Sequence, residues 1–160
     1  MSPTLIEYLT AGPETDAMIE REIFGHDVEE GPRKGIFFVT EIDGQTGAPS
    51  PTRAPYPFSA NVLDALAILN RFPGWRMWQE SGDIRYVNVQ LNLVMAPWGN
   101  VTITGNGRDL SIALAICKAA LMWIAMLGAA RDIFNKGQQK ETDERVETRQ
   151  EKTPDAIRDR

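Results

Sequence analysis

The chain has 160 residues, a length that predicts one compact domain with room for an ordinary hydrophobic core. Its formal net charge of −5 argues against binding to duplex nucleic acid, because neutralising phosphates needs clustered Lys and Arg side chains. The single cysteine, Cys117, excludes an intrachain disulfide and a cysteine-built metal site. We therefore expect a reducing, cytoplasmic setting, and the N-terminal residues do not resemble a secretory signal.

The first half of the chain predicts two helices separated by a long loop. Residues 14–24 carry apolar side chains at helical spacing, with Thr15 or Asp16 as the cap and Gly25 as the end. Residues 26–34 are charged or turn-forming, and the run 36–40 predicts an edge strand. The segment 43–57 has too many prolines for a regular element, so it predicts a loop. A second helix then follows a cap at Ser59 or Asn61 and stops at Pro73-Gly74.

The second half predicts an antiparallel sheet followed by a long helix. Residues 75–80 and 84–93 alternate in polarity, which indicates a hairpin with one buried face, and residues 101–104 predict a third strand. From Arg108 to Phe134 the chain is rich in Ala, Leu, Met and Ile, which favour a helix. The apolar surface of this helix is so wide that either protein or lipid must cover it.

The length of the helix does not decide between protein and lipid, because Leu110 to Ala130 is long enough to span a bilayer. Lys118 near the middle would cost about 2.5–3.5 kcal/mol in lipid. The alternating strands also need an apolar partner, so we expect the helix to lie on the sheet. Residues 135–160 are strongly charged and predict a disordered tail, with a nascent helix over 141–151 as the alternative. The expected organisation is a domain over 1–134 and a tail over 135–160.

Three stretches in a fixed order carry a resemblance to a known family. They are residues 16–25, Pro57-Phe58-Ser59 leading into Ala65-Leu66, and residues 115–121. In this order they resemble the phage ABA sandwich domain, a small α/β/α family of bacteriophage and prophage proteins, although Asn61 stands where an acidic cap would be expected. The resemblance implies an α/β/α sandwich of viral origin and assigns no catalytic residues. We expect an α+β fold: an antiparallel sheet of three or four strands packed with helices, the long C-terminal helix on its apolar face.

Two sets of residues are candidates for a ligand site. Gly105, Asn106, Gly107 and Arg108 fall between the third strand and the long helix, where converging backbone N–H groups and an arginine could hold an anion. The alternative is a tight turn with Asp109 or Ser111 as the helix cap, since neither a P-loop nor a dinucleotide fingerprint is present.

The second set is aromatic and could stack on a planar ligand or anchor a protein partner. Its members are Trp78, Trp98, Tyr86 and Tyr56. The alternative is that these rings fill the core. Trp75 and Trp78 are three residues apart, so a regular strand places them on opposite faces.

The remaining chemistry-bearing residues predict no catalytic centre. His26 is the only histidine, which excludes sites that need two imidazoles, and we expect it to be exposed after Gly25. We expect a solvated acidic loop at residues 27–30 and a core position for Cys117. No cofactor and no metal are expected.

We therefore expect a non-catalytic phage accessory protein in the host cytoplasm, binding a host protein or a small ligand, with counter-defence as one role. Apolar helix surface left uncovered would support a homo-oligomer. One alternative is a small enzyme acting on a nucleotide-like substrate, with Arg108 and the glycine segment as its phosphate site. Another is a membrane-associated protein held by the long helix.

Overall fold

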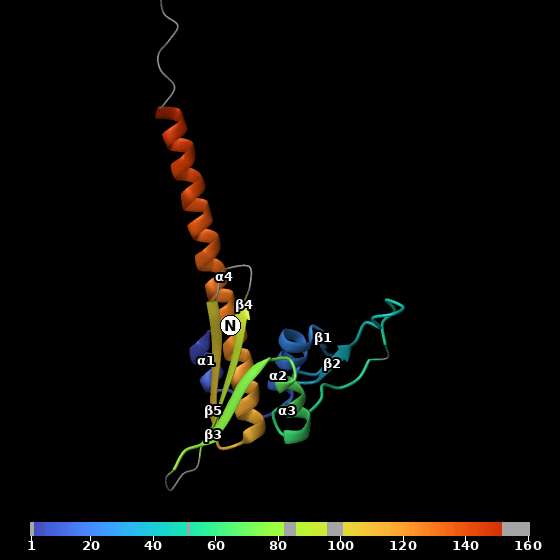
Figure 1. Ribbon diagram of the computed structural model, residues 1–160. Coiled ribbons are helices and arrows are strands. Elements are labelled where there is room, and N and C mark those ends of the chain that lie inside the picture. Colours follow the sequence, from blue (N-terminus) through green and yellow to red (C-terminus); the bar gives the residue numbers. More distant parts are fainter. Residues whose placement is uncertain (1, 51, 82–85, 96–100, 152–160) are drawn as a thin grey trace, which may run out of the picture. The chain divides into compact units, whose positions relative to one another are not determined.

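The fold is α+β, as predicted, but its strands form two antiparallel sheets packed with helices, of two and three strands, instead of the single sheet expected (Figure 1). A computed structural model describes residues 2–50, 52–81, 86–95 and 101–151. The chain divides into two units, 1–127 and 128–160. The elements are, in chain order, α1 (Pro3–Glu7), α2 (Pro13–Ile19), the π-helix η1 (Glu20–Phe24), β1 (Asp27–Glu30), β2 (Phe37–Thr40), α3 (Val62–Leu69), β3 (Gly74–Gln79), β4 (Val87–Met95), β5 (Val101–Asp109) and α4 (Ile112–Glu151).

The first predicted helix is present as α2 continued by η1. It ends as expected at Gly25, whose φ of 73° lies in the left-handed region that favours glycine. Its predicted caps, Thr15 and Asp16, are wrong, because Pro13 occupies the first turn after Gly12. Proline is pre-organised for that position, so the helix begins earlier than its apolar pattern suggests. In α3, by contrast, Asn61 caps as predicted and accepts a hydrogen bond from the backbone N–H of Leu63 at 2.9 Å.

Two short elements, α1 and β1, were not predicted from the sequence, because each has only one buried side chain. In β1, Val28 is buried between exposed neighbours and pairs with Val39 of β2 in an antiparallel sheet. Residues 27–30 are therefore a strand and not the acidic loop expected there. In α1, Ile6 is the buried residue. One inward side chain in each element does not generate a detectable period.

The larger sheet has the order β3-β4-β5, and every pairing in it is antiparallel. Val87, Val89 and Leu91 of β4 are buried on one face, as the alternation predicted. The register aligns Trp78, Asn88 and Arg108 across the three strands on the opposite face, which we call the outer face. Residues 82–83 of the turn predicted at 81–83, and the whole turn predicted at 96–100 with Trp98, lie outside the described residues.

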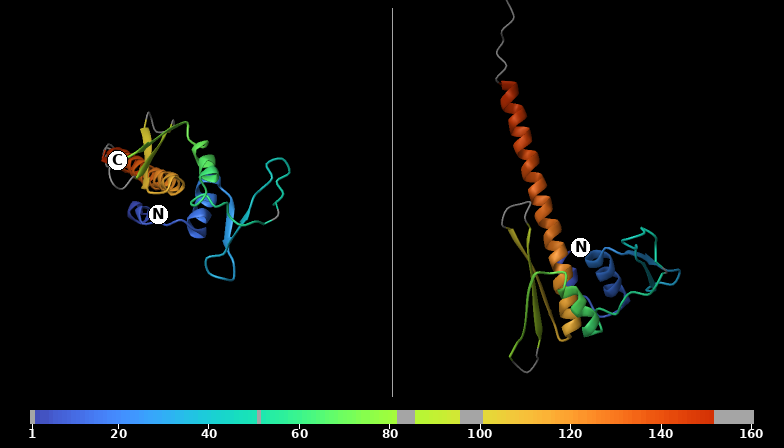
Figure 2. Two further views of the ribbon diagram at one scale, coloured as in Figure 1. Left: turned by 90° about the horizontal axis from the view of Figure 1, so that it is seen from below. Right: turned by 45° about the vertical axis from the view of Figure 1, so that its right-hand side comes forward.

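Helix α4 packs directly against the backbone of β5 (Figure 2). A Cβ atom added to Gly105 would lie 2.1 Å from the carbonyl oxygen of Ala119, and one added to Gly107 would lie 2.0 Å from that of Ala115. The predicted turn at these glycines is wrong: β5 continues through them to Asp109, and α4 begins at Ile112, not Arg108. Close backbone approach requires these glycines. Ser111 does cap the helix, accepting from Leu114 N–H at 3.4 Å.

The apolar part of α4 is covered mainly by protein. Among the described residues, Ile112–Ile133 is the stretch long and apolar enough to cross a membrane, and 56% of its apolar window is buried. Trp123 meets Phe72 edge to face at 5.3 Å between ring centroids. Beyond residue 134, α4 continues to Glu151. Opposite charges at four-residue spacing, such as Glu141 and Arg145, favour this helix.

Replacing Gly107 by Ala tests the close packing of β5 against α4. The new methyl group would meet helix backbone that cannot move alone, so we expect the free energy of unfolding to fall by at least about 2 kcal/mol. Gly44→Ala is the matched control, because nothing lies within 4 Å of an added Cβ there. Urea unfolding of both variants measures the difference. Equal stabilities would contradict the packing described here.

Candidate functional site

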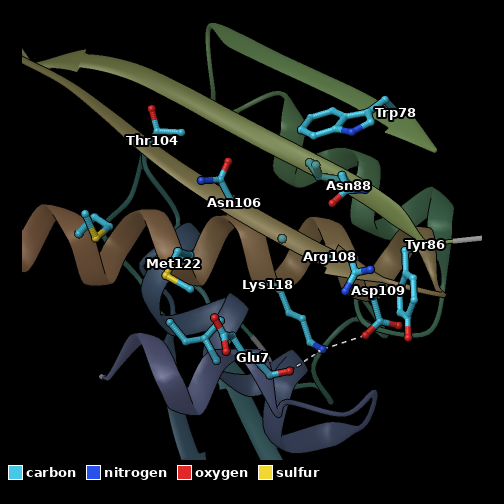
Figure 3. Close-up of a pocket in the computed structure, with 14 residues that line it drawn as sticks. Glu7, Trp78, Tyr86, Asn88, Thr104, Asn106, Arg108, Asp109, Lys118 and Met122 are labelled. Carbon is cyan, nitrogen blue, oxygen red and sulfur yellow. Dashed lines mark hydrogen bonds and ion pairs between the residues drawn. The ribbon is translucent and has the colours of Figure 1, made fainter. Parts of the chain in front are cut away.

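A pocket of about 760 Å³ lies where β5 meets α1 and α4 (Figure 3). We call it the sheet pocket. It brings together five predicted site residues: Trp78, Tyr86, Asn106, Gly107 and Arg108. Its remaining lining residues are Ile6, Glu7, Asn88, Val89, Thr104, Asp109, Lys118, Met122 and Met126.

The other predicted site residues lie elsewhere. A side chain at Gly105 would point into α4, so this residue serves packing. Tyr56 lines a second pocket, which is described below. Trp98 is outside the described residues.

Arg108 is held on the outer face by Glu80, which directly follows β3. Its Nε and Nη2 atoms donate to the two carboxylate oxygens of Glu80 at 3.0 and 2.8 Å. Asn88 donates to the same carboxylate at 3.1 Å, and the guanidinium carbon of Arg108 lies 3.9 Å from the ring centroid of Tyr86. Hydrogen bonds from Arg108 and Asn88 lower the pKa of Glu80. This bidentate geometry fixes the guanidinium plane against the tyrosine ring.

The strand geometry of the glycine segment does not favour the candidate backbone anion site. Gly105 and Gly107 are paired in register with Leu91 and Val89 of β4. An extended strand directs successive N–H groups to opposite sides, whereas an anion nest needs them to converge. The nearby arginine, Arg108, is already paired with a carboxylate.

On the helical side of the sheet pocket, Lys118 joins three elements. Its Nζ atom donates to the carbonyl oxygen of Glu7 at 2.9 Å and to Oδ2 of Asp109 at 2.8 Å (Figure 3). Burial raises the pKa of Asp109, but hydrogen bonds from Lys118 and the Ser111 N–H outweigh it and lower that pKa overall. Lys118, the residue predicted to make membrane insertion of this helix unfavourable, therefore has hydrogen-bond partners within the protein.

The sheet pocket offers flat rings, amides and soft apolar side chains beside paired charges. Trp78 is 43% exposed, with the guanidinium carbon of Arg76 5.0 Å from its ring centroid. Asn106 accepts a hydrogen bond from Gln90 at 3.0 Å, which orients its amide. Met122 contributes an adaptable apolar surface. Such a lining suits a planar ligand that also forms hydrogen bonds.

A second group of polar residues was missed by the sequence prediction. Glu20 is fully buried and accepts from Arg53 at 2.7 and 3.3 Å, from the Tyr56 N–H at 3.0 Å and from His26 Nδ1 at 2.6 Å. Arg53 also binds Glu41 at 3.0 Å through its Nε atom. We call these residues, Glu20, His26, Glu41, Arg53 and Tyr56, the Glu20 cluster. His26 therefore pairs with a buried carboxylate, whereas the sequence predicted an exposed histidine.

The cluster had a weak signal in the sequence. Asp16 and Glu20 are four residues apart, so both lie on one face of the helix, and both are buried. Asp16 accepts from the Ser59 N–H at 2.7 Å. Arg53 is an arginine in the proline-rich loop and a possible partner for such a carboxylate. The path of an irregular loop cannot be predicted from the sequence, so neither can the ion pair between Arg53 and Glu20. The bridge between Val39 and Arg53 places that loop beside β2.

The described residues contain no group of three or more His, Cys, Asp or Glu side chains arranged for a metal ion. Cys117 is buried, as predicted, and burial raises the pKa of its thiol well above the ordinary range. A thiol in this environment is a poor nucleophile.

Comparison with solved structures finds a similar fold in the crystal structure of a phage protein from Bacillus cereus. The TM-score is 0.50 with 15% sequence identity, and the match covers 78% of this chain and 89% of that chain. Identity this low shows similarity of fold alone. No protein-family model and no curated protein matches the chain.

Replacing Glu20 by Gln tests the Glu20 cluster. The change leaves Arg53 and His26 without their buried anion, so we expect the free energy of unfolding at pH 7 to fall by about 3 kcal/mol. Burial raises the pKa of Glu20, but hydrogen bonds from Arg53, Tyr56 and His26 lower it below its ordinary value of 4.5.

A carboxyl group with a lowered pKa stabilises the fold above its ordinary pKa, and this stabilisation is lost as pH falls through the folded-state value. The difference between wild type and Glu20→Gln should therefore narrow below about pH 4.5. Chemical unfolding across pH 3–7 measures it, with Glu22→Gln, an exposed glutamate on the same helix, as the control. A difference independent of pH would contradict the assigned role of charge.

Proposed function

We propose that the chain is a non-catalytic phage accessory protein that binds a small planar ligand in the sheet pocket. The observation that carries the proposal is the convergence of Trp78, Tyr86, Asn106 and Arg108 on one pocket. Its volume of about 760 Å³ falls within the range of roughly 300–1,000 Å³ typical of ligand sites. The similarity in fold to a phage protein supports the phage setting.

We further propose membership of the phage ABA sandwich family and action in the host cytoplasm. A protein that holds a small host molecule without converting it acts by lowering that molecule's free concentration. Sequestration of this kind is the counter-defence role we favour. It requires affinity and abundance, and it requires no acid, base or metal.

The ligand that suits the pocket is planar and rich in hydrogen-bonding groups, as nucleobases are. Trp78 and Tyr86 supply ring faces, and the amides of Asn88 and Asn106 supply donors and acceptors. Because Arg108 is paired with Glu80 and Lys118 with Asp109, neither cation is free to select a negatively charged ligand. Shape and hydrogen bonding would decide which ligand binds.

A nucleotide-acting enzyme has less support. Arg108 would have to exchange Glu80 for a phosphate, and the glycine segment is committed to the sheet. A membrane-associated protein also has less support, because Lys118 is buried among polar partners in the protein. We retain homo-oligomerisation as a proposal, since Met126 and Leu110 leave apolar surface exposed.

Binding to a host protein is the second candidate function. Trp75 and Trp78 are 51% and 43% exposed on opposite faces of β3. Tryptophan is among the residues most enriched at the energetic centres of protein interfaces. An exposed edge strand with two such rings could anchor a protein partner.

A thermal-shift screen with nucleotides and cyclic nucleotides tests the ligand proposal. A ligand at about 100 times its dissociation constant should stabilise the wild type by about 2.7 kcal/mol. Trp78→Ala and Arg108→Ala should each weaken binding at least tenfold, because each removes a wall of the sheet pocket. The control is Arg33→Ala, an exposed arginine outside the pocket. If no compound shifts the melting temperature, the ligand proposal is contradicted and binding to a host protein is favoured.

Affinity capture from host lysate, read by mass spectrometry, tests the protein-partner candidate. A host protein recovered by the wild type should be lost with the double variant Trp75→Ala and Trp78→Ala, because the anchoring rings are removed. Leu63→Ala, a change at another exposed apolar residue, should leave capture unaltered. Equal recovery by all three proteins would exclude β3 as the contact surface.

A further inference from the structure

A second pocket, of about 220 Å³, is walled by aromatic rings next to the Glu20 cluster. We call it the aromatic pocket; its residues are Glu20, Phe24, His26, Tyr56, Phe58, Leu63, Asp64 and Ala67. The rings of Phe24 and Phe58 are stacked at 5.1 Å with an interplanar angle of 14°. Tyr56 meets Phe58 edge to face at 6.0 Å. These contacts fix the orientation of three walls.

Rings in this pocket already attract cations from the chain itself. The guanidinium carbon of Arg53 lies 4.0 Å from the ring centroid of Tyr56, and that of Arg71 lies 4.9 Å from the centroid of Phe24. An aromatic face attracts a cation through its quadrupole, most strongly where water is excluded. The same ring environment is therefore suited to a cationic ligand.

The charges around the pocket also favour a cation. Burial raises the pKa of Asp16, and repulsion from the carboxylates of Glu20 and Asp64 adds to that rise. Arg53 is the cation bound to Glu20, and it is shared with Glu41. In the part of the chain that the structure describes, no hydrogen bond or ion pair engages the half-buried carboxylate of Asp64. With Arg71 at the Phe24 ring counted as a second cation beside Arg53, the carboxylates of Glu20, Glu41 and Asp64 still leave a small surplus of negative charge around the pocket.

We propose that the aromatic pocket binds an organic cation, an alkylammonium or guanidinium group, against the rings that line it, with Asp64 as the counter-charge. The group could belong to a free small molecule or to a lysine or arginine side chain of a partner protein. The site shares no lining residue with the sheet pocket, so it does not depend on the function proposed above.

Titration with choline and with dimethylbutanol, its uncharged isostere, tests the proposal at constant ionic strength. Methyl signals of Leu63 and Ala67 in NMR spectra report on the pocket. We expect saturable binding of choline and at least tenfold weaker binding of the isostere, because only choline gains from ring faces and carboxylate. Equal affinities for the two compounds, or no binding of choline, would overturn the proposal.

Variants assign the binding to named groups. Asp64→Asn and Tyr56→Leu should each weaken choline binding at least fivefold, whereas Tyr56→Phe keeps a ring face and should retain most of the affinity. Glu22→Gln makes the same charge change outside the pocket and should have no effect. Thermal unfolding checks that each variant is folded. Unchanged affinity in folded Asp64→Asn and Tyr56→Leu would show that the aromatic pocket is not the site.

A third arm identifies the source of the cation. Short peptides containing one lysine or one arginine are titrated against the same methyl signals. Tighter binding of a peptide than of choline favours a partner protein, and tighter binding of choline favours a free molecule. Either order supports a cation site, and displacement of neither ligand by the other would contradict a shared site.

Discussion

The contact between α4 and the backbone of β5 is the constraint on which the first unit depends. Gly105 and Gly107 let the carbonyl groups of Ala119 and Ala115 approach within a distance that any side chain would prevent. This contact sets the position of the helix on the sheet. It also fixes where Lys118 can reach Asp109 and the carbonyl of Glu7. The helical wall of the sheet pocket follows from the same two glycines.

Covering one face of the sheet leaves an ordered set of polar and aromatic side chains on the other face. Val87, Val89 and Leu91 are committed to the covered face, so their neighbours in the alternation must point outward. On that outer face, Glu80 binds both Arg108 and Asn88. The ordered arrangement of polar and aromatic groups is therefore a consequence of strand register, once the core face is set.

The elements predicted most reliably from the sequence are those with a regular pattern of apolar residues. Alternation in β4, the helical pattern of α3 and α4, and the caps Asn61 and Ser111 all express local rules that a short window contains. Gly105 and Gly107 were misread, because a glycine needed for close packing and a glycine needed for a turn look alike in one dimension. The helix that demands them comes later in the chain.

The candidate site was predictable in part for the same reason. Residues on neighbouring strands, such as Trp78 and Arg108, converge through regular pairing, and the sequence identified both. Glu20 and Arg53 are 33 residues apart and meet through an irregular loop. No helical or strand periodicity in the sequence relates two positions that meet through an irregular loop. Only the three-dimensional path of the loop reveals that a buried carboxylate has a partner.

The two pockets differ in how their charges are compensated, and this difference separates their chemistry. In the sheet pocket, Arg108 and Lys118 each have a carboxylate partner, so a ligand there would gain little from a negative charge. In the aromatic pocket, Arg53 is shared by two glutamates, and Asp64 adds a further carboxylate. A buried or half-buried charge without compensation is costly to the fold, and a bound ion of opposite sign removes that cost. If both proposals hold, selection by shape in one pocket and by charge in the other arises from the placement of a few ion pairs.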